Sequence, residues 1–386
     1  MPNKSRIYLD YAATTPLDPA VLKIMNEAGE RYYANPSSLH YPGQESKVAI
    51  EKARQVIAES IQAKAREIVF TGSGTESNNL ALIGAAQANR SKGNHIITTR
   101  IEHVSVLECC EYLKNERFRI TYLNVNKLGQ VDPEELKSSI DSDTILVSVM
   151  MANNETGCLL PIKEIGAILS EQKVLFHVDA VQAFGKIDIS VQDLKADLLT
   201  VSAHKIYGPK GIAALYIGND VSVERILHGG AQERNRRPGT ENITGIIGFS
   251  EAVTLMNEKK DEHNRILNLR NYFEHELKQR IPDIRINGDE GSRLYSHSNI
   301  YFPFIPGDAM LMSLDIQGIA VSVGSACSSG SQRPSHVLTA MGFEPERINR
   351  SVRFSFGRFT SREETEQALD RISEIFQSRL KGIKYV

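Results

Sequence analysis

The chain has 386 residues, of which 41% are hydrophobic and 24% charged, and its formal net charge is -2 at pH 7. This ordinary globular balance excludes a disordered or fibrous chain, and the small net charge gives no field that attracts nucleic acid or an anionic membrane. No apolar stretch is long enough to span a bilayer. The first five residues lack the apolar core of a secretion signal, and four cysteines are too few for a disulfide framework. We therefore expect a cytoplasmic protein with mostly free thiols.

Short β-branched runs alternate with longer helical stretches through the first half of the chain. Strands are predicted at 68–71, 95–99, 119–125, 144–150, 174–179, 198–203 and 211–217, with helices at 75–90, at 104–116 and in later gaps. Fully apolar strands separated by helices predict an α/β fold with a mainly parallel seven-stranded sheet covered on both faces. Ligands of such sheets bind at the carboxyl ends of the strands.

The pattern changes after residue 240. Residues 241–281 contain no proline and have apolar residues at helical spacing, which predicts one long helix or two in series. Beyond Pro282, strands at 298–304, 320–325 and 351–356 and helices at 307–317, 334–341 and 361–381 predict a smaller α+β unit. We therefore expect a large domain at 15–255 and a small domain at 1–14 and 256–386.

Three motifs in the predicted large domain carry chemistry. A glycine turn, Thr71-Gly-Ser-Gly-Thr75, joins a strand to a helix, where backbone amides and the positive end of the helix dipole suit an anion. Asp179 ends an apolar strand, where a carboxylate needs a cationic or hydrogen-bonding partner. Lys205 directly follows another apolar strand, and a low-dielectric strand end favours the neutral amine that forms Schiff bases. Together these groups predict pyridoxal 5′-phosphate, with its phosphate on the helix, its pyridine nitrogen on Asp179 and its aldehyde carbon on Lys205.

Taken singly, the motifs have simpler explanations. The glycine turn alone can be no more than a capped turn, and Asp179 alone can be a strand-end carboxylate that caps a turn. His103 alone can be a structural histidine. Asn154 beside Asn153 can equally form only a turn, and Arg353 alternates with apolar residues and can equally be an exposed ion-pair partner. The combination of motifs decides between these interpretations.

Motifs along nearly the whole chain resemble the NifS/IscS-type cysteine desulfurases, which are fold-type I pyridoxal phosphate enzymes. The resemblance is carried by Tyr8-Leu-Asp-Tyr-Ala-Ala-Thr-Thr-Pro16, Asn35-Pro-Ser-Ser38, Gly74-Thr-Glu-Ser-Asn-Asn79, Glu102-His103, Asn153-Asn-Glu-Thr-Gly157, Asp179-Ala-Val-Gln182, Ser202-Ala-His-Lys205, Arg237-Pro-Gly-Thr240, Gly324-Ser-Ala-Cys-Ser-Ser329 and Arg353-Phe-Ser355. It implies a homodimer that transfers sulfur from L-cysteine to an acceptor protein and needs no metal.

The resemblance also implies a role for each matching residue. The catalytic positions are Lys205 as the Schiff-base lysine, His103 as the ring-stacked acid or base, and Cys327 as the sulfur acceptor. The positions that bind the cofactor phosphate are Gly74, Thr75, Ser202, His204 and, from the second subunit, Thr240. The positions that contact its ring are Asp179, Asn154 and Gln182. Asn35 and Arg353 match the pair that holds the substrate carboxylate, for which a bidentate arginine is well suited.

Cys327 differs from the other cysteines in its surroundings. Gly324-Ser-Ala-Cys-Ser-Ser-Gly-Ser331 places small residues around it, which keeps a thiol accessible and lets the chain bend. This long serine- and glycine-rich segment resembles group I of the family. Cys109 and Cys110 lie in a predicted helix, where a small buried hydrophobe is the default, and Cys158 has no neighbours at metal-ligand spacing.

Several functions remain open from the sequence. An aminotransferase or another β-lyase on the same fold would turn over without Cys327, and a selenocysteine lyase activity can accompany desulfuration. A non-catalytic sulfur-relay adaptor would have no need of an intact Lys205 and Asp179. The acceptor of the sulfur is equally open between an iron–sulfur scaffold, a tRNA thiolation enzyme, and a thiamin or molybdopterin sulfur carrier.

Overall fold

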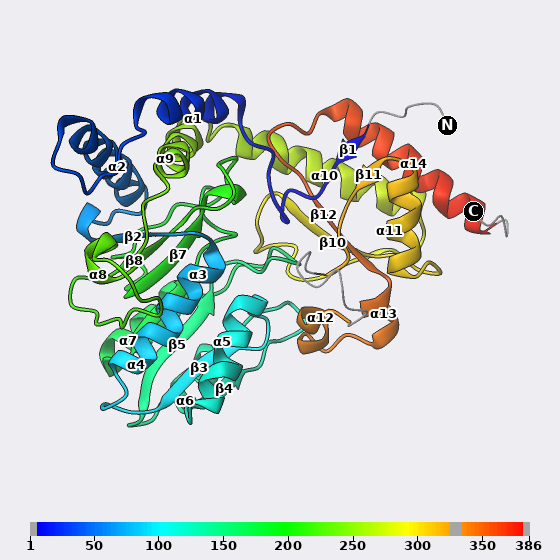
Figure 1. Cartoon of the computed structure of the whole chain (residues 1–386). Coiled ribbons are helices and arrows are strands. Elements are labelled where there is room, and N and C mark those ends of the chain that lie inside the picture. Colours follow the sequence, from blue (N-terminus) through cyan, green and yellow to red (C-terminus); the bar gives the residue numbers. More distant parts are fainter. Residues whose placement is uncertain (1–5, 325–333, 381–386) are drawn as a thin grey trace.

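A seven-stranded sheet forms the centre of the larger part of the molecule (Figure 1). The computed structural model describes residues 6–324 and 334–380. Across the sheet the strands are β2 (Ile68–Thr71), β8 (Ala213–Ile217), β7 (Leu198–Ser202), β6 (Leu175–Asp179), β5 (Thr144–Met150), β3 (His95–Thr99) and β4 (Arg119–Leu123). All neighbours pair in parallel except β8, which is antiparallel to both β2 and β7. The predicted mainly parallel seven-stranded sheet is therefore confirmed.

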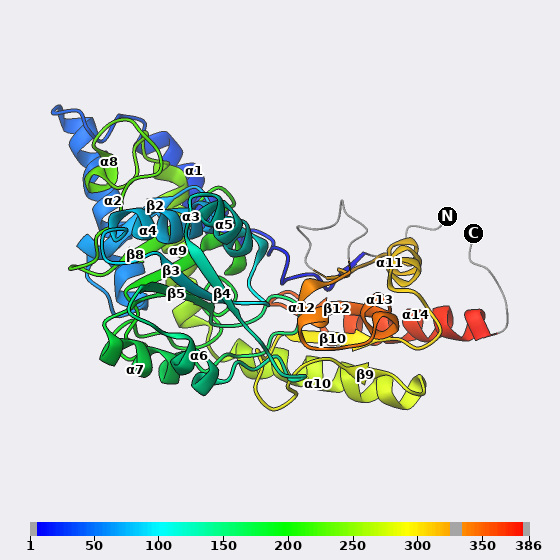
Figure 2. The same ribbon diagram turned by 90° about the horizontal axis from the view of Figure 1, so that it is seen from below.

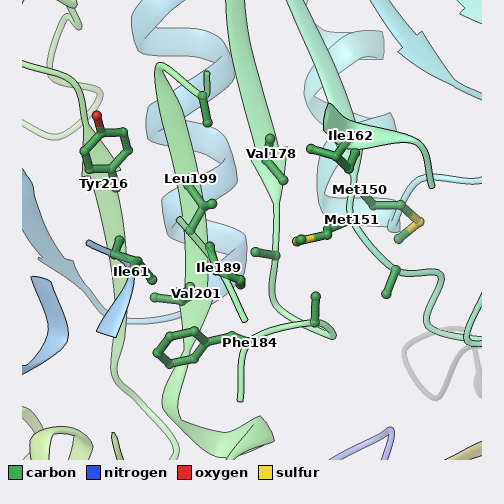
Figure 3. Packing of buried hydrophobic residues seen from close by; sticks show 14 of the residues in the cluster. Ile61, Met150, Met151, Ile162, Val178, Phe184, Ile189, Leu199, Val201 and Tyr216 are labelled. Atoms are coloured by element: carbon green, nitrogen blue, oxygen red, sulfur yellow. The ribbon is translucent and has the colours of Figure 1, made fainter. Parts of the chain in front are cut away.

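Apolar side chains pack on both faces of this sheet. The strand β5 contributes to both faces: Leu146 belongs to one buried cluster and Val147 to the other. Figure 3 shows part of the second cluster, where Leu199 and Val201 lie near Ile189 and Phe184. The absence of an alternating polar pattern in these strands thus has a direct cause, because neither face meets water.

Helices form the outer layers. One layer consists of α1 (Pro19–Arg31), α2 (Tyr41–Ser60), α6 (Pro133–Ser139), α7 (Ile162–Gln172) and α9 (Ile243–Glu258), all of which contribute to the cluster of Figure 3. The opposite layer is α5 (Val104–Asn115) and the run of α3 (Gly74–Asn79), a π-helical turn (Leu80–Gly84) and α4 (Ala85–Ala88). Single turns complete this part at η1 (Ala65–Glu67), η3 (Ala203–Lys205) and α8 (Gln232–Asn235).

Two helices in series connect the two parts of the molecule. α9 ends at Glu258, and α10 (Glu262–Arg280) follows after a short break, which confirms the second of the two predicted alternatives. The break lies in the polar stretch of the sequence, where no apolar stripe holds a continuous helix against a core.

A separate hydrophobic cluster forms the smaller part (Figure 2). Its sheet consists of β9 (Arg285–Ile286), β10 (His297–Tyr301) and β12 (Ser351–Ser355), and β1 (Ile7–Tyr8) pairs in parallel with β11 (Ile319–Ala320). The helices α11 (Gly307–Ile316) and α14 (Arg362–Leu380) contribute to this cluster, whereas α12 (His336–Ala340) and α13 (Pro345–Asn349) pack against the cluster of the large sheet. Ile7 and Leu9 join the cluster of the smaller part, so the amino terminus packs with the carboxyl-terminal part. The exact domain boundaries remain a prediction.

Candidate active site

The carboxyl ends of five strands meet at one edge of the large sheet. The segments that follow these strands are 72–79 after β2, 100–105 after β3, 151–157 after β5, 180–182 after β6 and 203–205 after β7. Because these strands run in the same direction, their polar termini lie side by side. This edge faces the smaller part of the molecule and brings most of the predicted site residues together (Figure 1).

The turn between β2 and α3 has the features of an anion site. Ser73 caps the helix, its Oγ accepting from the Glu76 N–H at 3.1 Å, and Gly74 is the first helical residue. A Cβ placed on Gly74 would lie 3.1 Å from Val181 Cγ2, so a side chain there would crowd the turn that follows Asp179. Thr75 is exposed at this helix start, where its amide belongs to the positive end of the dipole.

Asp179 lies at the centre of this edge with its carboxylate held by neutral donors. It is 5% exposed; Oδ1 accepts from the Val181 N–H at 3.0 Å and Oδ2 from Asn78 Nδ2 at 2.8 Å. Two such hydrogen bonds offset the loss of hydration without neutralising the charge. A carboxylate in this setting suits a protonated ring nitrogen.

His103 is linked to Asp179 through two residues that the sequence analysis did not assign. Asn78 Nδ2 also donates to Ser105 Oγ at 2.9 Å, and Ser105 Oγ lies 2.8 Å from His103 Nδ1. The Ser105 backbone N–H donates to the same Nδ1 at 3.2 Å. Burial lowers the pKa of His103, so its imidazole is neutral near pH 7.

Lys205 ends the single turn η3 and reaches the amino-terminal segment. Its Nζ donates to the carbonyl oxygens of Ala12 at 2.6 Å and Ala13 at 2.8 Å, and Gln182 Nε2 donates to the same Ala12 oxygen at 2.9 Å. Ser202 is buried at the end of β7, and His204 Nδ1 lies 3.2 Å from Thr14 Oγ1. Burial lowers the pKa of His204 to about 3, so it is a neutral donor or acceptor.

Two buried polar atoms at this edge are suited to a ligand. Asn154 Oδ1 and Gln182 Oε1 are fully buried and have no hydrogen-bond partner among the described residues. The neighbouring Asn153 serves the backbone instead, because its Oδ1 caps the N–H groups of Glu155 and Thr156, so the turn needs only the first asparagine. Together with the cradle at Gly74 and the carboxylate of Asp179, the two atoms fit pyridoxal phosphate.

Arg353 faces the same edge from β12 of the smaller part. It is 1% exposed, which excludes the exposed ion-pair alternative; Nη1 donates to the Asn154 carbonyl at 2.9 Å and Nη2 to Asp10 Oδ1 at 2.8 Å. Its Nε has no partner within the described ranges. A buried guanidinium with an unused donor is equipped to bind a carboxylate.

Two predicted residues do not join this group within one copy of the chain. Asn35 is exposed in the segment between α1 and α2, and its Oδ1 caps the Ser37 N–H. This segment lies on the far side of the large part from β12, the strand that contains Arg353 (Figures 1 and 2). Its predicted pairing with Arg353 is thus absent from the described contacts of a single copy. Thr240 is exposed three residues after Arg237, whose guanidinium pairs with Glu76 of the α3 start. Cys327 lies outside the described residues.

Sequence reasoning missed four residues that support this edge. Asn78 and Ser105 form the link described above, and their only signal was a place inside or next to a quoted motif. Glu102 is fully buried; burial raises its pKa to about 8, and Oε1 accepts from Thr99 Oγ1 and the Met150 N–H. Lys186 donates to the Gln182 carbonyl, and burial followed by the charge of Lys205 lowers its pKa to about 7. Local sequence does not show such burial.

Comparisons with known proteins agree with this site. Residues 7–368 match the family described as Aminotransferase class-V. The chain belongs to this family. It is 47% identical to a protein of Dictyoglomus turgidum named cysteine desulfurase IscS, over 97% of this chain and 95% of that protein. It is 46% identical to the putative cysteine desulfurase IscS 1 of Bacillus subtilis, over 96% of this chain and 98% of that protein.

A solved structure titled NifS-like protein superposes with a TM-score of 0.91 at 36% identity, over 96% of this chain and 99% of that one. The chain is therefore a NifS/IscS-type cysteine desulfurase homologue of fold-type I and a pyridoxal phosphate-dependent enzyme, as its motifs predicted. No helix within residues 6–324 or 334–380 is both long and apolar enough to cross a membrane. The predicted cytoplasmic location stays a prediction.

Proposed function

We propose that this enzyme converts L-cysteine to L-alanine and transfers the sulfur to Cys327 as a persulfide. The observation that carries the proposal is the position of the two described flanks of the Cys327 segment. Ser322 exchanges backbone hydrogen bonds with Arg353, and its Oγ donates to Asp10 Oδ2 at 2.8 Å. On the other flank Ser335 Oγ donates to Glu155 at 2.5 Å, next to Asn154. Both flanks are therefore tied to the residues that surround Arg353.

The flanks also meet each other. A Cβ placed on Gly324 would lie 3.9 Å from Ser335 Cβ and 3.9 Å from the Glu155 carboxylate oxygens. Gly324 and Ser335 are thus close in space, and Cys327 is the third residue beyond Gly324 in the sequence. We expect the thiol of a residue so near Gly324 in the chain to reach the sulfur of a substrate whose carboxylate Arg353 holds.

In this proposal each side chain of the site has a separate role. Arg353 binds the substrate carboxylate, Asp179 holds the positive charge of the ring nitrogen, and the amides of Gly74 and Thr75 hold the phosphate. Pyridoxal phosphate supplies the electron sink that stabilises negative charge on the substrate. Lys205 Nζ takes the proton from the substrate α-carbon.

The sulfur transfer needs no oxidant or reductant besides the Cys327 thiolate and the substrate. The Cys327 thiolate attacks the substrate sulfur, and the new sulfur–sulfur bond forms as the bond from sulfur to the β-carbon breaks. The electron pair of that bond stays on the carbon, which takes up a proton, so alanine leaves and Cys327 keeps the sulfur.

We further propose a group I enzyme that acts as a homodimer, with Thr240 and the exposed loop around it serving the second copy. Its sulfur acceptor is an iron–sulfur scaffold or a tRNA thiolation enzyme. We propose Asn35 as a substrate residue only in the homodimer, because within one copy its segment between α1 and α2 lies on the far side of the large part from β12. Light scattering on the loaded protein measures the oligomeric state directly.

One assay tests the proposed reaction. The loaded protein receives L-cysteine and a thiol reductant, and alanine and sulfide are quantified for the parent, Cys327→Ser and a matched control, Cys109→Ala in α5. Equal amounts of both products from the parent and the control, with turnover lost in Cys327→Ser, support the proposal. Pyruvate in place of alanine, or turnover with a keto acid that ignores Cys327, would instead indicate a β-lyase or an aminotransferase.

A further inference from the structure

Hydrogen bonds link Asp179 to His103 through Asn78 and Ser105. A carboxylate only accepts hydrogen bonds, so the group of Asn78 that faces Asp179 Oδ2 at 2.8 Å is the amide nitrogen, not the oxygen. The second N–H of that nitrogen points to Ser105 Oγ at 2.9 Å, which therefore acts as an acceptor toward Asn78. Ser105 Oγ keeps its own proton and lies 2.8 Å from His103 Nδ1, where it donates if that nitrogen is unprotonated.

A second donor confirms the state of that nitrogen. The backbone N–H of Ser105, which cannot accept, points to His103 Nδ1 at 3.2 Å. An Nδ1 that accepts from a backbone N–H carries no proton itself, so the Ser105 hydroxyl also donates to it, and a neutral imidazole then has its one proton on Nε2. The charge of Asp179 thus sets the orientation of Asn78, and the backbone N–H of Ser105 sets the tautomer of His103.

We propose that Asn78 and Ser105 are positioning residues that hold His103 in the Nε2–H tautomer, so that His103 enters the reaction as a hydrogen-bond donor and not as a base. A neutral imidazole of this kind polarises a reacting oxygen or nitrogen without giving up its proton, a role known from other enzymes. The base for Cys327 must then be another group. This consequence rests on the proposed function, whereas the tautomer does not.

The surroundings of His103 are consistent with this role. The charged and titratable groups that face it are Asp179 from β6, Lys205 from η3 and His336 from α12. His336 Nε2 lies 2.8 Å from the carbonyl oxygen of Glu102, which precedes His103. Ser105 is buried at 7% exposure and Asn78 at 1%, so water does not compete for their hydrogen bonds.

Nuclear magnetic resonance tests the tautomer without reference to activity. Histidine labelled with ¹⁵N is incorporated into the pyridoxal phosphate-loaded protein and into the cofactor-free protein, and the His103 signals are assigned with His103→Gln. The proposal expects an unprotonated Nδ1 and a protonated Nε2 near pH 7 in both forms. A protonated Nδ1 would overturn it, even if the enzyme proved to be an active desulfurase.

Variants of Ser105 test the positioning role. Ser105→Ala removes one of the two donors to Nδ1, so we expect the His103 signals to shift and kcat to fall about tenfold while KM for L-cysteine stays within about twofold. Ser105→Thr keeps the hydroxyl, so we expect it to restore the parental His103 signals and the parental kcat. Ser313→Ala, which removes another buried helical hydroxyl, is the matched control. Unchanged His103 signals and unchanged kcat in Ser105→Ala would contradict the proposal.

Discussion

The two charged centres of the site, around Asp179 and around Arg353, are built in opposite ways. Asp179 belongs to one sheet and is held by the neutral N–H groups of Val181 and Asn78, so its charge is still available to a cationic ligand. Arg353 is assembled with Asp10 and Asn154 from three distant parts of the chain, and Asp10 already pairs with its charge. On the proposed assignment, the cofactor would therefore meet the uncompensated charge of Asp179, whereas the substrate would share the charge of Arg353 with Asp10.

The largest effect is expected where the charge is uncompensated. Asp179→Asn keeps the shape and the hydrogen bond from Val181 but removes the negative charge, so we expect kcat/KM for L-cysteine to fall by at least about 100-fold. Turnover and the absorbance of the bound cofactor are measured together. Asp220→Asn, at an exposed position, is the control. Near-parental turnover in Asp179→Asn would show that the ring nitrogen does not depend on this charge.

Glu102 provides a contrast to the charged Asp179, because it is a buried acid close to Asp179 that the fold keeps neutral. Burial raises its pKa from 4.5 to about 8, and its Oε2 has no partner among the residues that the structure describes. The folded state therefore binds this proton more tightly than the unfolded state. The stabilisation is complete below about pH 4.5 and is lost as the pH rises through about 8.

We accordingly expect the parent to lose about 3 kcal/mol of unfolding free energy relative to Glu102→Gln between about pH 5 and pH 7.5. Urea unfolding at both pH values measures this difference. Glu171→Gln, an exposed replacement in α7, should follow the parent at both values. Parallel pH dependence of the parent and Glu102→Gln would mean that Glu102 is ionised in the folded protein.

A smaller effect on catalysis is expected at Arg353, whose charge is already paired with Asp10. Arg353→Lys leaves a cation for Asp10 but removes the planar fork and the free Nε, so we expect KM for L-cysteine to rise about 30-fold, or about 2 kcal/mol. Steady-state kinetics measure it, with the exposed Arg285→Lys in β9 as the control. If kcat fell and KM stayed constant, Arg353 would have a role other than holding the ground-state substrate.

The smallest effect is expected at the anion cradle. The Cβ of Gly74→Ala would lie 3.1 Å from Val181 Cγ2, so a shift of a few tenths of an ångström should weaken cofactor binding about tenfold. Titration of the cofactor-free protein followed by absorbance measures this affinity. In Gly29→Ala of α1 the added Cβ makes an ordinary 3.5 Å contact, so its affinity should equal that of the parent.

The two centres also differ in how far the sequence predicted them. The surroundings of Asp179 can be predicted from local patterns, because a few residues are enough to identify a strand, a turn or a helix start. Parallel strands then bring their carboxyl ends together. Arg353 was assigned only by resemblance, since its burial depends on β10, β12 and the amino-terminal segment packing together. Asn78 and Ser105 were missed because a hydrogen-bond link between two helix starts has no local signature.

The most direct test of the proposed reaction is the chemical state of Cys327 after one turnover. The loaded protein is mixed with L-cysteine without reductant, digested, and analysed by mass spectrometry of its cysteine peptides. We predict one additional sulfur atom on the Cys327 peptide and none on the peptides of Cys109, Cys110 and Cys158, whose thiols are buried. Alanine release with an unmodified Cys327, or added sulfur on another cysteine instead, would contradict the proposed sulfur transfer.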